Sequence, residues 1–267
     1  MNLKSAIGTM KFDELDARMR VFETAHDHCA LPGLFLVARL DGRGFTRLTK
    51  EVHPFEAPFD ERMRDLMTST VTHLLGCGVR ILYGYTQSDE ISLLLHPEEN
   101  TFSRKLRKYT SILAGEASAK FSLELGSVGA FDCRISQLPR EQDVVDYFRW
   151  RQEDAGRNAL NAHCYWMLRK LGHSVAAATR QVLGLGTAAK HDLLFGQGIN
   201  YNNLPAWQKR GVGLYGEDYR KLGFNPVSRE AVQAVRRRLK TDYELPLGQA
   251  YDTFIQTLLH QEQVGES

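Results

Sequence analysis

Two aspartates, each close to the end of a predicted strand, are the residues whose types and spacing suggest chemistry. Asp41 follows the apolar run 34–40, and Asp89 lies in a polar link between the short apolar runs 79–83 and 91–95. Two carboxylates held close together repel each other, and a cation between them relieves that repulsion. Hard oxygen ligands suit Mg²⁺, and two such ions stabilise the attacking and leaving oxygens of an in-line phosphoryl displacement. The pair therefore predicts a two-metal site for phosphoryl transfer.

Three groups of residues could hold phosphates beside this pair. Gly42 and Gly44 follow the strand directly and allow backbone N–H groups to approach phosphate oxygens. Lys105 and Lys108 are three residues apart, so a helix places them on one side, where they could neutralise a triphosphate. Arg134, on a later predicted strand, is a further candidate. An acidic turn or a lysine pair alone is typical of a solvated surface, so the prediction depends on these residues acting together.

The predicted elements bring the two aspartates to one edge of a sheet. Periodicity and turn residues predict helices at 13–28, 58–75 and 103–125, and strands at 34–40, 79–83, 91–95 and 130–135. After the first helix, the order is strand, helix, strand, strand, helix, strand. This is the α+β, ferredoxin-like plan of polymerase palms and nucleotide cyclases, an antiparallel sheet with helices on one face. In that plan the hairpin turn meets the end of the first strand.

The second half of the chain is predicted to be mostly helical. Helices are expected from 141 to 169 and at 174–184, 229–239 and 247–261. We therefore expect a palm-like catalytic domain at residues 1–138 and a mostly helical region at 139–267 that packs on the palm. The pattern assigns no role to residues 216–267.

Composition narrows the class of protein. Of 267 residues, 43% are hydrophobic and 25% charged, which is ordinary for a globular protein, and no apolar run approaches the ~20 residues of a membrane span. The early residues do not resemble a secretory signal, and the four cysteines are scattered without a C-x-x-C pair. We expect a cytoplasmic protein with reduced thiols. Its net charge is only +2, so nucleic acid binding would need local basic patches, such as those at 104–108, 209–210 and 236–240.

Several motifs resemble the tRNA-His guanylyltransferase family, the 3′-to-5′ polymerases. The strongest are Arg39–Arg47 (RLDGRGFTR) and Tyr85–Ser92 (YTQSDEIS). The resemblance continues through 131–134, 146–152, 190–195 and 199–203, and it spans roughly residues 12 to 215. Separate motifs in the same order make this resemblance strong.

The resemblance implies roles for particular residues. Asp41, the Gly42 carbonyl and Asp89 would hold two Mg²⁺ ions, with Glu90 supporting the metal shell as the third catalytic residue. ATP, GTP or another nucleoside triphosphate would be bound by the metal-binding residues and by the backbone or side chains of Arg43, Gly44, Phe45, Thr46, Ser88, Lys105, Lys108 and Arg134. The residues expected to contact tRNA are Asn158, Lys190, Asn202, Lys209 and Arg210. The family activates a 5′-monophosphate RNA end with ATP, and the 3′-hydroxyl of a nucleotide then attacks it. A homotetramer without membrane association is also implied.

Two departures from the family pattern bear, respectively, on the choice of RNA and on one predicted phosphate or metal-shell contact. Members that add guanosine to tRNA-His carry a His-Ile-Asn-Asn-Leu-Tyr-Asn segment where this chain has 156–162, and only Asn158 and Leu160 match. Ala57 stands where relatives place a lysine. The first departure favours the branch that repairs tRNA 5′ ends by templated addition. Strict guanylyltransfer to tRNA-His is the alternative, and a palm-type nucleotide cyclase or a non-catalytic RNA-binding module is more distant.

Overall fold

A single antiparallel sheet runs through the part of the chain that the computed structural model describes, residues 11–225 and 230–261. Its strands are β1 (Phe35–Arg43), β2 (Ile81–Gln87), β3 (Glu90–Leu95), β4 (Ala130–Leu138), β5 (Val212–Asn225) and β6 (Glu230–Asp242). They are hydrogen-bonded in the order β4-β1-β3-β2-β5-β6. The first four strands with the two helices between them form the predicted palm, so the α+β, ferredoxin-like prediction is confirmed.

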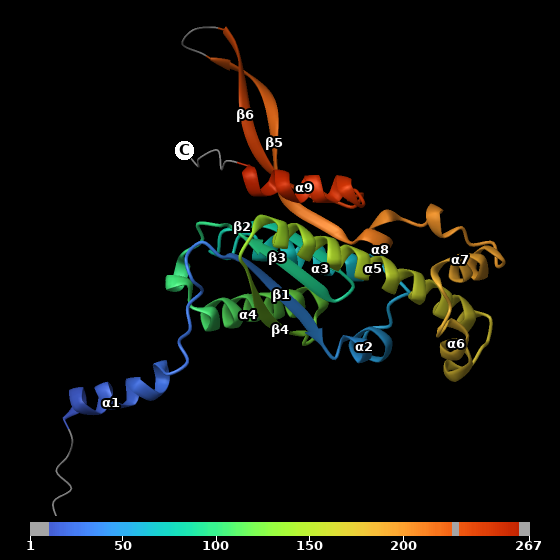
Figure 1. The fold of residues 1–267 in the computed structure, drawn as a ribbon, viewed down its shortest axis with the longest axis horizontal. Helices are drawn as coiled ribbons and strands as arrows, with labels where there is room; N and C mark the ends of the chain where they lie inside the picture. Colours follow the sequence, from blue (N-terminus) through green and yellow to red (C-terminus); the bar gives the residue numbers. More distant parts are fainter. Residues whose placement is uncertain (1–10, 226–229, 262–267) are drawn as a thin grey trace, which may run out of the picture.

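Helices cover both faces of this sheet (Figure 1). They are α1 (Phe12–Thr24), α2 (Phe45–Arg47), α3 (Glu61–Leu74), α4 (Leu106–Leu125), α5 (Glu141–Lys170), α6 (Val175–Val182), α7 (Thr187–Phe195), α8 (Ala206–Arg210) and α9 (Gln249–His260), with a π-helical turn at Leu48–Val52 and 3₁₀ turns at Thr101–Arg104 and Tyr201–Asn203. The palm helices α3 and α4 pack on one face, and α5 and α9 on the other. None of the described helices is both long and apolar enough to span a membrane.

The alternation of side chains along β1 decides which of them lie on the same face of the sheet as Asp41. In β1, Leu36, Ala38 and Leu40 belong to the core under α3 and α4, while Val37 belongs to the core under α5. Residues at odd positions of β1 therefore face α5. Near its end this face carries Asp41, which is paired in register with Glu90 of β3. The sheet thus meets the expectation that the hairpin turn lies at the end of the first strand.

The second half contains the predicted helices and also a long hairpin that was not predicted. Residues 212–225 and 230–242 form β5 and β6, so the helix predicted at 229–239 is wrong. That stretch contains four arginines, two alanines and a leucine, residues that favour helices in isolation. Pairing of β6 with β5, which itself pairs with β2 through Tyr83–Thr86 and Val212–Tyr215, overrides that preference. A third small core joins the end of α5 to α6 and α7.

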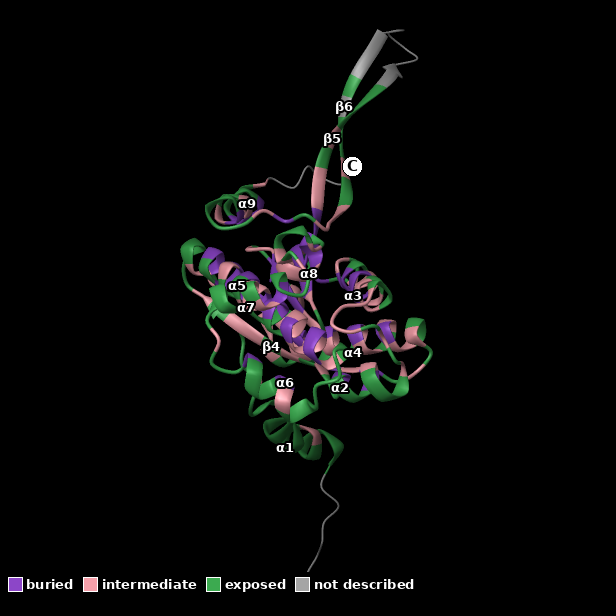
Figure 2. Ribbon diagram, turned by 90° about the vertical axis from the view of Figure 1, so that its right-hand side faces the viewer, coloured by how far each residue is buried: buried purple, intermediate pink, exposed green. Residues whose placement is uncertain are grey.

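The N-terminal helix projects from the body (Figure 1). A helix is predicted at 13–28, and the structure has α1 at Phe12–Thr24, on which Leu15, Met19 and Phe22 recur at helical spacing. No residue of α1 is buried, and Phe22 is 72% exposed. Figure 2 shows the same contrast between the exposed α1 and the purple inner faces of α3, α4 and α5. The apolar spacing of α1 therefore does not serve the core of this chain.

Asp60 is the N-cap residue of α3 and stabilises the start of this helix. Its carboxylate caps α3 by accepting from the Arg62 N–H at 2.8 Å, and it also accepts from the Glu56 N–H at 2.7 Å. The Arg62 guanidinium and these backbone donors hold the pKa of Asp60 at about 2. Because this pKa lies below its unfolded value, the carboxylate stabilises the fold above about pH 4, and this contribution is lost as pH falls toward about 2.

We predict that Asp60→Ala lowers the free energy of unfolding by about 1 kcal/mol at pH 7, the usual cost of losing a helix cap. Urea unfolding of both proteins at a series of pH values measures this. The difference between them should shrink below pH 4. A difference that stays constant down to pH 3 would show that the ionised carboxylate is not the stabilising group. Asp65→Asn, an exposed change on α3, is the control.

Candidate active site

Three carboxylates converge where the β2–β3 hairpin turns beside β1. Asp41 and Glu90 are direct partners in the β1–β3 pairing, and the Gly42 N–H donates to the Asp89 carbonyl at 3.1 Å. Ser88, which has a positive φ of 55°, donates its hydroxyl to the Asp89 carboxylate at 3.1 Å. The backbone of the turn is therefore fastened to β1, which fixes Asp89 near Asp41.

Three arginines surround these carboxylates. Arg39 Nη2 lies 3.5 Å from Asp41 Oδ2 and also donates to Glu90. Arg151, from α5, donates to the other oxygen of Glu90. Arg134 Nη2 lies 4.0 Å from Asp41 and 3.4 Å from Asp132. Glu90 is thus held by two guanidiniums and links the hairpin turn to α5, rather than pointing freely toward a metal.

The carboxylate pair fits a divalent cation. Asp89 has a pKa above its ordinary value because it is buried, and the charges of Asp41 and Glu90 raise that pKa further. An ionised Asp89 is therefore costly without a cation, which is the condition that Mg²⁺ relieves. The described residues contain no cluster of three or more His, Cys, Asp or Glu suited to a metal. Mg²⁺ needs only one or two carboxylates when substrate phosphates and waters complete its shell, so Asp41, Asp89 and the Gly42 carbonyl could hold it.

The predicted glycines have specific reasons to be glycine. A side chain at Gly42 would start 2.5 Å from the Phe45 ring, a distance at which something must move. Gly44 has φ of 72°, in the left-handed region that favours glycine, and it begins the short helix α2. Phe45 is buried against Phe121 and Phe131, at 5.0 Å between ring centroids in each case. The chain therefore turns tightly after Asp41, which brings Thr46 to the rim of a cavity.

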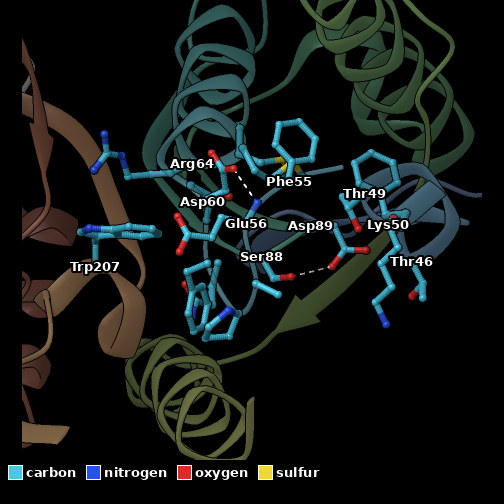
Figure 3. A pocket seen from close by; sticks show the side chains of 18 of the residues that line it. Thr46, Thr49, Lys50, Phe55, Glu56, Asp60, Arg64, Ser88, Asp89 and Trp207 are labelled. Atoms are coloured by element: carbon cyan, nitrogen blue, oxygen red, sulfur yellow. Dashed lines mark hydrogen bonds between the residues drawn. The ribbon is translucent and has the colours of Figure 1, made fainter. Parts of the chain in front are cut away.

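A cavity of about 190 Å³ opens beside Asp89 (Figure 3). Its lining includes Thr46, Thr49, Lys50, Phe55, Glu56, Asp60, Arg64, Ser88, Asp89 and Trp207. The Arg64 guanidinium lies 4.9 Å from the centroid of the Trp207 ring and 5.0 Å from that of Tyr243. Hydroxyl and ammonium groups and aromatic rings in one lining suit a ligand that carries both phosphates and a flat base. Ala57, one of the departures from the family, also lines this cavity.

The structure does not bring Lys105 and Lys108 to the carboxylates within one chain. They lie at the start of α4, whereas the site lies near its end, because Ala130, just after α4, pairs with Arg43. The 20 residues of α4 span about 30 Å at 1.5 Å each. Lys105 instead pairs with Asp27 at 2.5 Å. Of the predicted cations, Arg134 is the one that reaches the site.

The residues predicted to contact RNA lie on α5, on α7, in the 3₁₀ turn at 201–203 and on α8. Asn158 is exposed on α5, and Asn202 is exposed near Lys209. Lys209 Nζ donates to the Asn202 carbonyl at 2.8 Å, and Arg210 Nη1 donates to the Leu245 carbonyl at 3.0 Å. Lys190, on α7, is half-buried. Contact of these five residues with RNA stays a prediction, and the intramolecular bonds of Lys209 and Arg210 give both a structural role.

Sequence reasoning missed the partners of the carboxylates. Arg39 and Arg151 both lie within the motifs of the resemblance, but nothing in the pattern pairs either with Glu90. Lys50, whose ammonium lies 5.4 Å from the centroid of the Trp166 ring, lines the cavity without any motif around it. The alternation of β1 could have indicated that Arg39 shares a face with Asp41.

A palm-type sheet with an acidic pair at its hairpin turn, beside a cavity with hydroxyls and aromatic rings, is suited to nucleotidyl transfer. The family model described as "tRNAHis guanylyltransferase" matches residues 16–139, and that of the "Thg1 C terminal domain" matches residues 142–245. The chain belongs to the tRNA-His guanylyltransferase family.

Relatives and solved structures agree with this assignment. A probable tRNA(His) guanylyltransferase of Drosophila melanogaster is 33% identical over 198 residues, covering 70% of this chain and 69% of that protein. The tRNA(His) guanylyltransferase of Debaryomyces hansenii is 32% identical over 228 residues, covering 80% and 86%. A bacterial tRNA(His) guanylyltransferase-like protein solved in complex with GTP is 26% identical, with a TM-score of 0.71, covering 92% of this chain and 99% of that one.

We predict that Asp41→Asn and Asp89→Asn each reduce nucleotidyl transfer at least about a hundredfold, because each removes a charge that would hold the metal. Single-turnover assays measure this. Asp89→Asn should not lower the thermal midpoint, since the ionised Asp89 is unfavourable in the fold. Asp65→Asn should keep full activity. Near-native activity of either site variant would remove that residue from the catalytic set.

Proposed function

We propose that this protein adds guanosine to the 5′ end of tRNA-His. The observation that carries the proposal is the meeting of Asp41 and Asp89 at the hairpin turn, beside a cavity that Thr46 and Ser88 line. Relatives that bear the name tRNA(His) guanylyltransferase support this substrate. Solved relatives in complex with ATP and with GTP support nucleoside triphosphates as co-substrates.

The reaction joins two phosphorylated reactants. The 5′-monophosphate of the RNA first displaces pyrophosphate from ATP, which leaves an adenylylated 5′ end. The 3′-hydroxyl of GTP then attacks the RNA phosphorus, a new P–O bond forms, and AMP leaves. Bound Mg²⁺ would supply charge neutralisation for both displacements. Asp41 and Asp89 would hold the metal, Arg134 would face the developing negative charge, and Ser88 orients Asp89. The backbone at 43–46 binds the triphosphate.

A second candidate function is templated repair of truncated tRNA 5′ ends. Segment 156–162 favours it, because Gly156, Ala159 and Ala162 stand where the tRNA-His-specific pattern has larger polar residues. Both candidates use the same carboxylates and the same chemistry, and they differ only in which RNA is chosen.

The remaining features of the proposal follow the family. The protein acts on tRNA in the cytoplasm, as a homotetramer, with residues 1–138 as the catalytic domain and 139–267 as the region packed on it. Two exposed features support assembly. α1 buries none of its residues, and beyond Tyr215 the β5 strand pairs only with β6 in the described part of the sheet. A second copy of the chain is the partner that would cover them.

We predict a single added guanosine on intact tRNA-His in the presence of ATP, GTP and Mg²⁺. The assay compares this RNA with a non-His tRNA that lacks its first 5′ nucleotide, with all four nucleotides present. Preference for the truncated tRNA, with the added base complementary to the 3′ strand, would replace guanylyltransfer by repair. The Asp41→Asn protein is the matched inactive control. Turnover without RNA, forming a cyclic nucleotide, would reject both.

We further predict that the wild-type protein sediments as a tetramer and that replacing Phe12 and Phe22 of α1 by glutamate lowers the oligomeric state. Both rings are over 70% exposed, at 76% and 72%, so the change should not disturb the fold of one chain. Arg18→Glu is the control for a charge change on the same helix. Analytical ultracentrifugation measures the oligomeric state of each protein, and a monomeric wild-type protein would refute the assembly.

A further inference from the structure

A second cavity, lined by α5, borders the same turn as the first. It measures about 220 Å³, and five residues, Pro58, Phe59, Gln87, Ser88 and Asp89, line both cavities. The two spaces are therefore neighbours with a common wall, and the carboxylate of Asp89 belongs to that wall. Any two reactants that meet at Asp89 can each have a cavity of their own.

The walls of the second cavity suit a flat ligand. From α5 the lining includes Ala155, Ala159 and Ala162, which follow one face of the helix. From the segment before α3 it includes Pro58 and Phe59. Small side chains and an aromatic ring in one lining leave a slot, and contacts with neighbouring rings hold the Phe59 ring in place. Phe59 lies 5.4 Å from His163 and 5.9 Å from Trp207, between ring centroids.

The ends of this slot are polar. Asp154 accepts from Arg151 at 3.3 Å and from the Asn158 amide at 3.2 Å, and Asn158 stands exposed at the rim. Tyr85 also lines the slot, and its buried hydroxyl has no hydrogen-bond partner among the described residues. A nucleobase combines flat apolar faces with polar edges. Enzymes recognise it by stacking on its faces and by hydrogen bonds to its edges.

The rim of the slot leads onto a polar surface that a longer ligand could follow. The Tyr201 hydroxyl donates to the Gly156 carbonyl at 3.2 Å, so the 3₁₀ turn at 201–203 is fastened to α5. Asn202 and Asn203 are exposed on that turn, as are Arg157 and Asn158 on α5. The second cavity thus continues into an exposed polar strip of the described surface.

We propose that the second cavity is a slot for the base of the 5′-terminal nucleotide of the RNA, while the nucleoside triphosphate occupies the first cavity. This inference rests on the proposed function, because that reaction brings two nucleotides to one metal-binding turn. The base stacks on Phe59, the RNA continues over the strip at 157–158 and 202–203, and the small side chain of Ala162 keeps the slot open. Ala162 is therefore a residue that determines acceptance of the RNA end.

Binding of a fluorescent RNA tests the slot without turnover. The probe is an RNA hairpin with 2-aminopurine as its 5′-terminal base, added to the full-length protein without nucleoside triphosphate. Stacking on Phe59 should quench the fluorescence, and base–aromatic stacking is worth about 5- to 150-fold in affinity. Ala162→Leu fills the slot and should restore the fluorescence and weaken binding about tenfold. Ala119→Leu, the same change at an exposed alanine of α4 outside the slot and the strip, is the matched control and should behave like wild type.

A second arm needs no protein variant. A hairpin whose 5′-terminal nucleotide is abasic should bind the wild-type protein about tenfold more weakly than the base-bearing hairpin. Ala162→Leu should bind both hairpins equally, and its KM for GTP should change less than twofold. Equal binding of the two hairpins by the wild-type protein, or quenching that survives Ala162→Leu, would overturn the slot.

These experiments test the slot and the proposed function independently. If wild-type protein extends tRNA but does not distinguish the two hairpins, the function stands and the slot is rejected. If no RNA is extended, the function fails, and the quenching and abasic arms still decide the slot. If Ala162→Leu strongly raised the KM for GTP and left RNA binding unchanged, the second cavity would bind the nucleoside triphosphate, and the inference would be overturned.

Discussion

The crowding of negative charge at one hairpin turn is the constraint on which the rest of the structure depends. Asp41, Asp89 and Glu90 lie together, and Asp89 is buried enough to raise its pKa. Such a cluster is stable only if cations oppose it. The protein supplies Arg39, Arg134 and Arg151 from two strands and one helix. These arginines neutralise Glu90 and flank Asp41, and no guanidinium pairs with Asp89 in the described structure. The charge of Asp89 is thereby left without a guanidinium partner among the described residues.

The position of these charges on the sheet also constrains the helices that pack against it. Because Asp41 lies on the α5 face of β1, the helix that covers that face must provide a polar end as well as an apolar body. α5 does both: Val144, Val145 and Phe148 enter the core, and one turn later Arg151 meets Glu90. The Arg149–Asp252 pair, at 2.7 Å, then fixes α9 to the same helix. One long helix therefore joins the apolar core, the acidic turn and the second cavity.

How much of this site the sequence predicts depends on how far apart in the chain the contacting residues lie. Asp41 and Asp89 could be brought together from strand order alone, since adjacent strands of a palm fix their ends. Helical spacing places Lys105 and Lys108 on one side of α4, but it does not say which end of the sheet they occupy. The partners of Glu90 come from positions 39 and 151, and such pairing has no local signal. The β5–β6 hairpin was not predicted, because β5 pairs with β2 more than 100 residues earlier and the local propensity of 229–239, which contributes to β6, favoured a helix.

The exposed α1 has a thermodynamic consequence. A helix of 13 residues that buries nothing is at the length, about 12–15 residues, where isolated helices are marginal in water. If its partner is another copy of the chain, ordering of this segment and assembly become one linked equilibrium governed by mass action. The helical content of the N-terminus would then rise with protein concentration, and dilution would unfold it before the palm is affected.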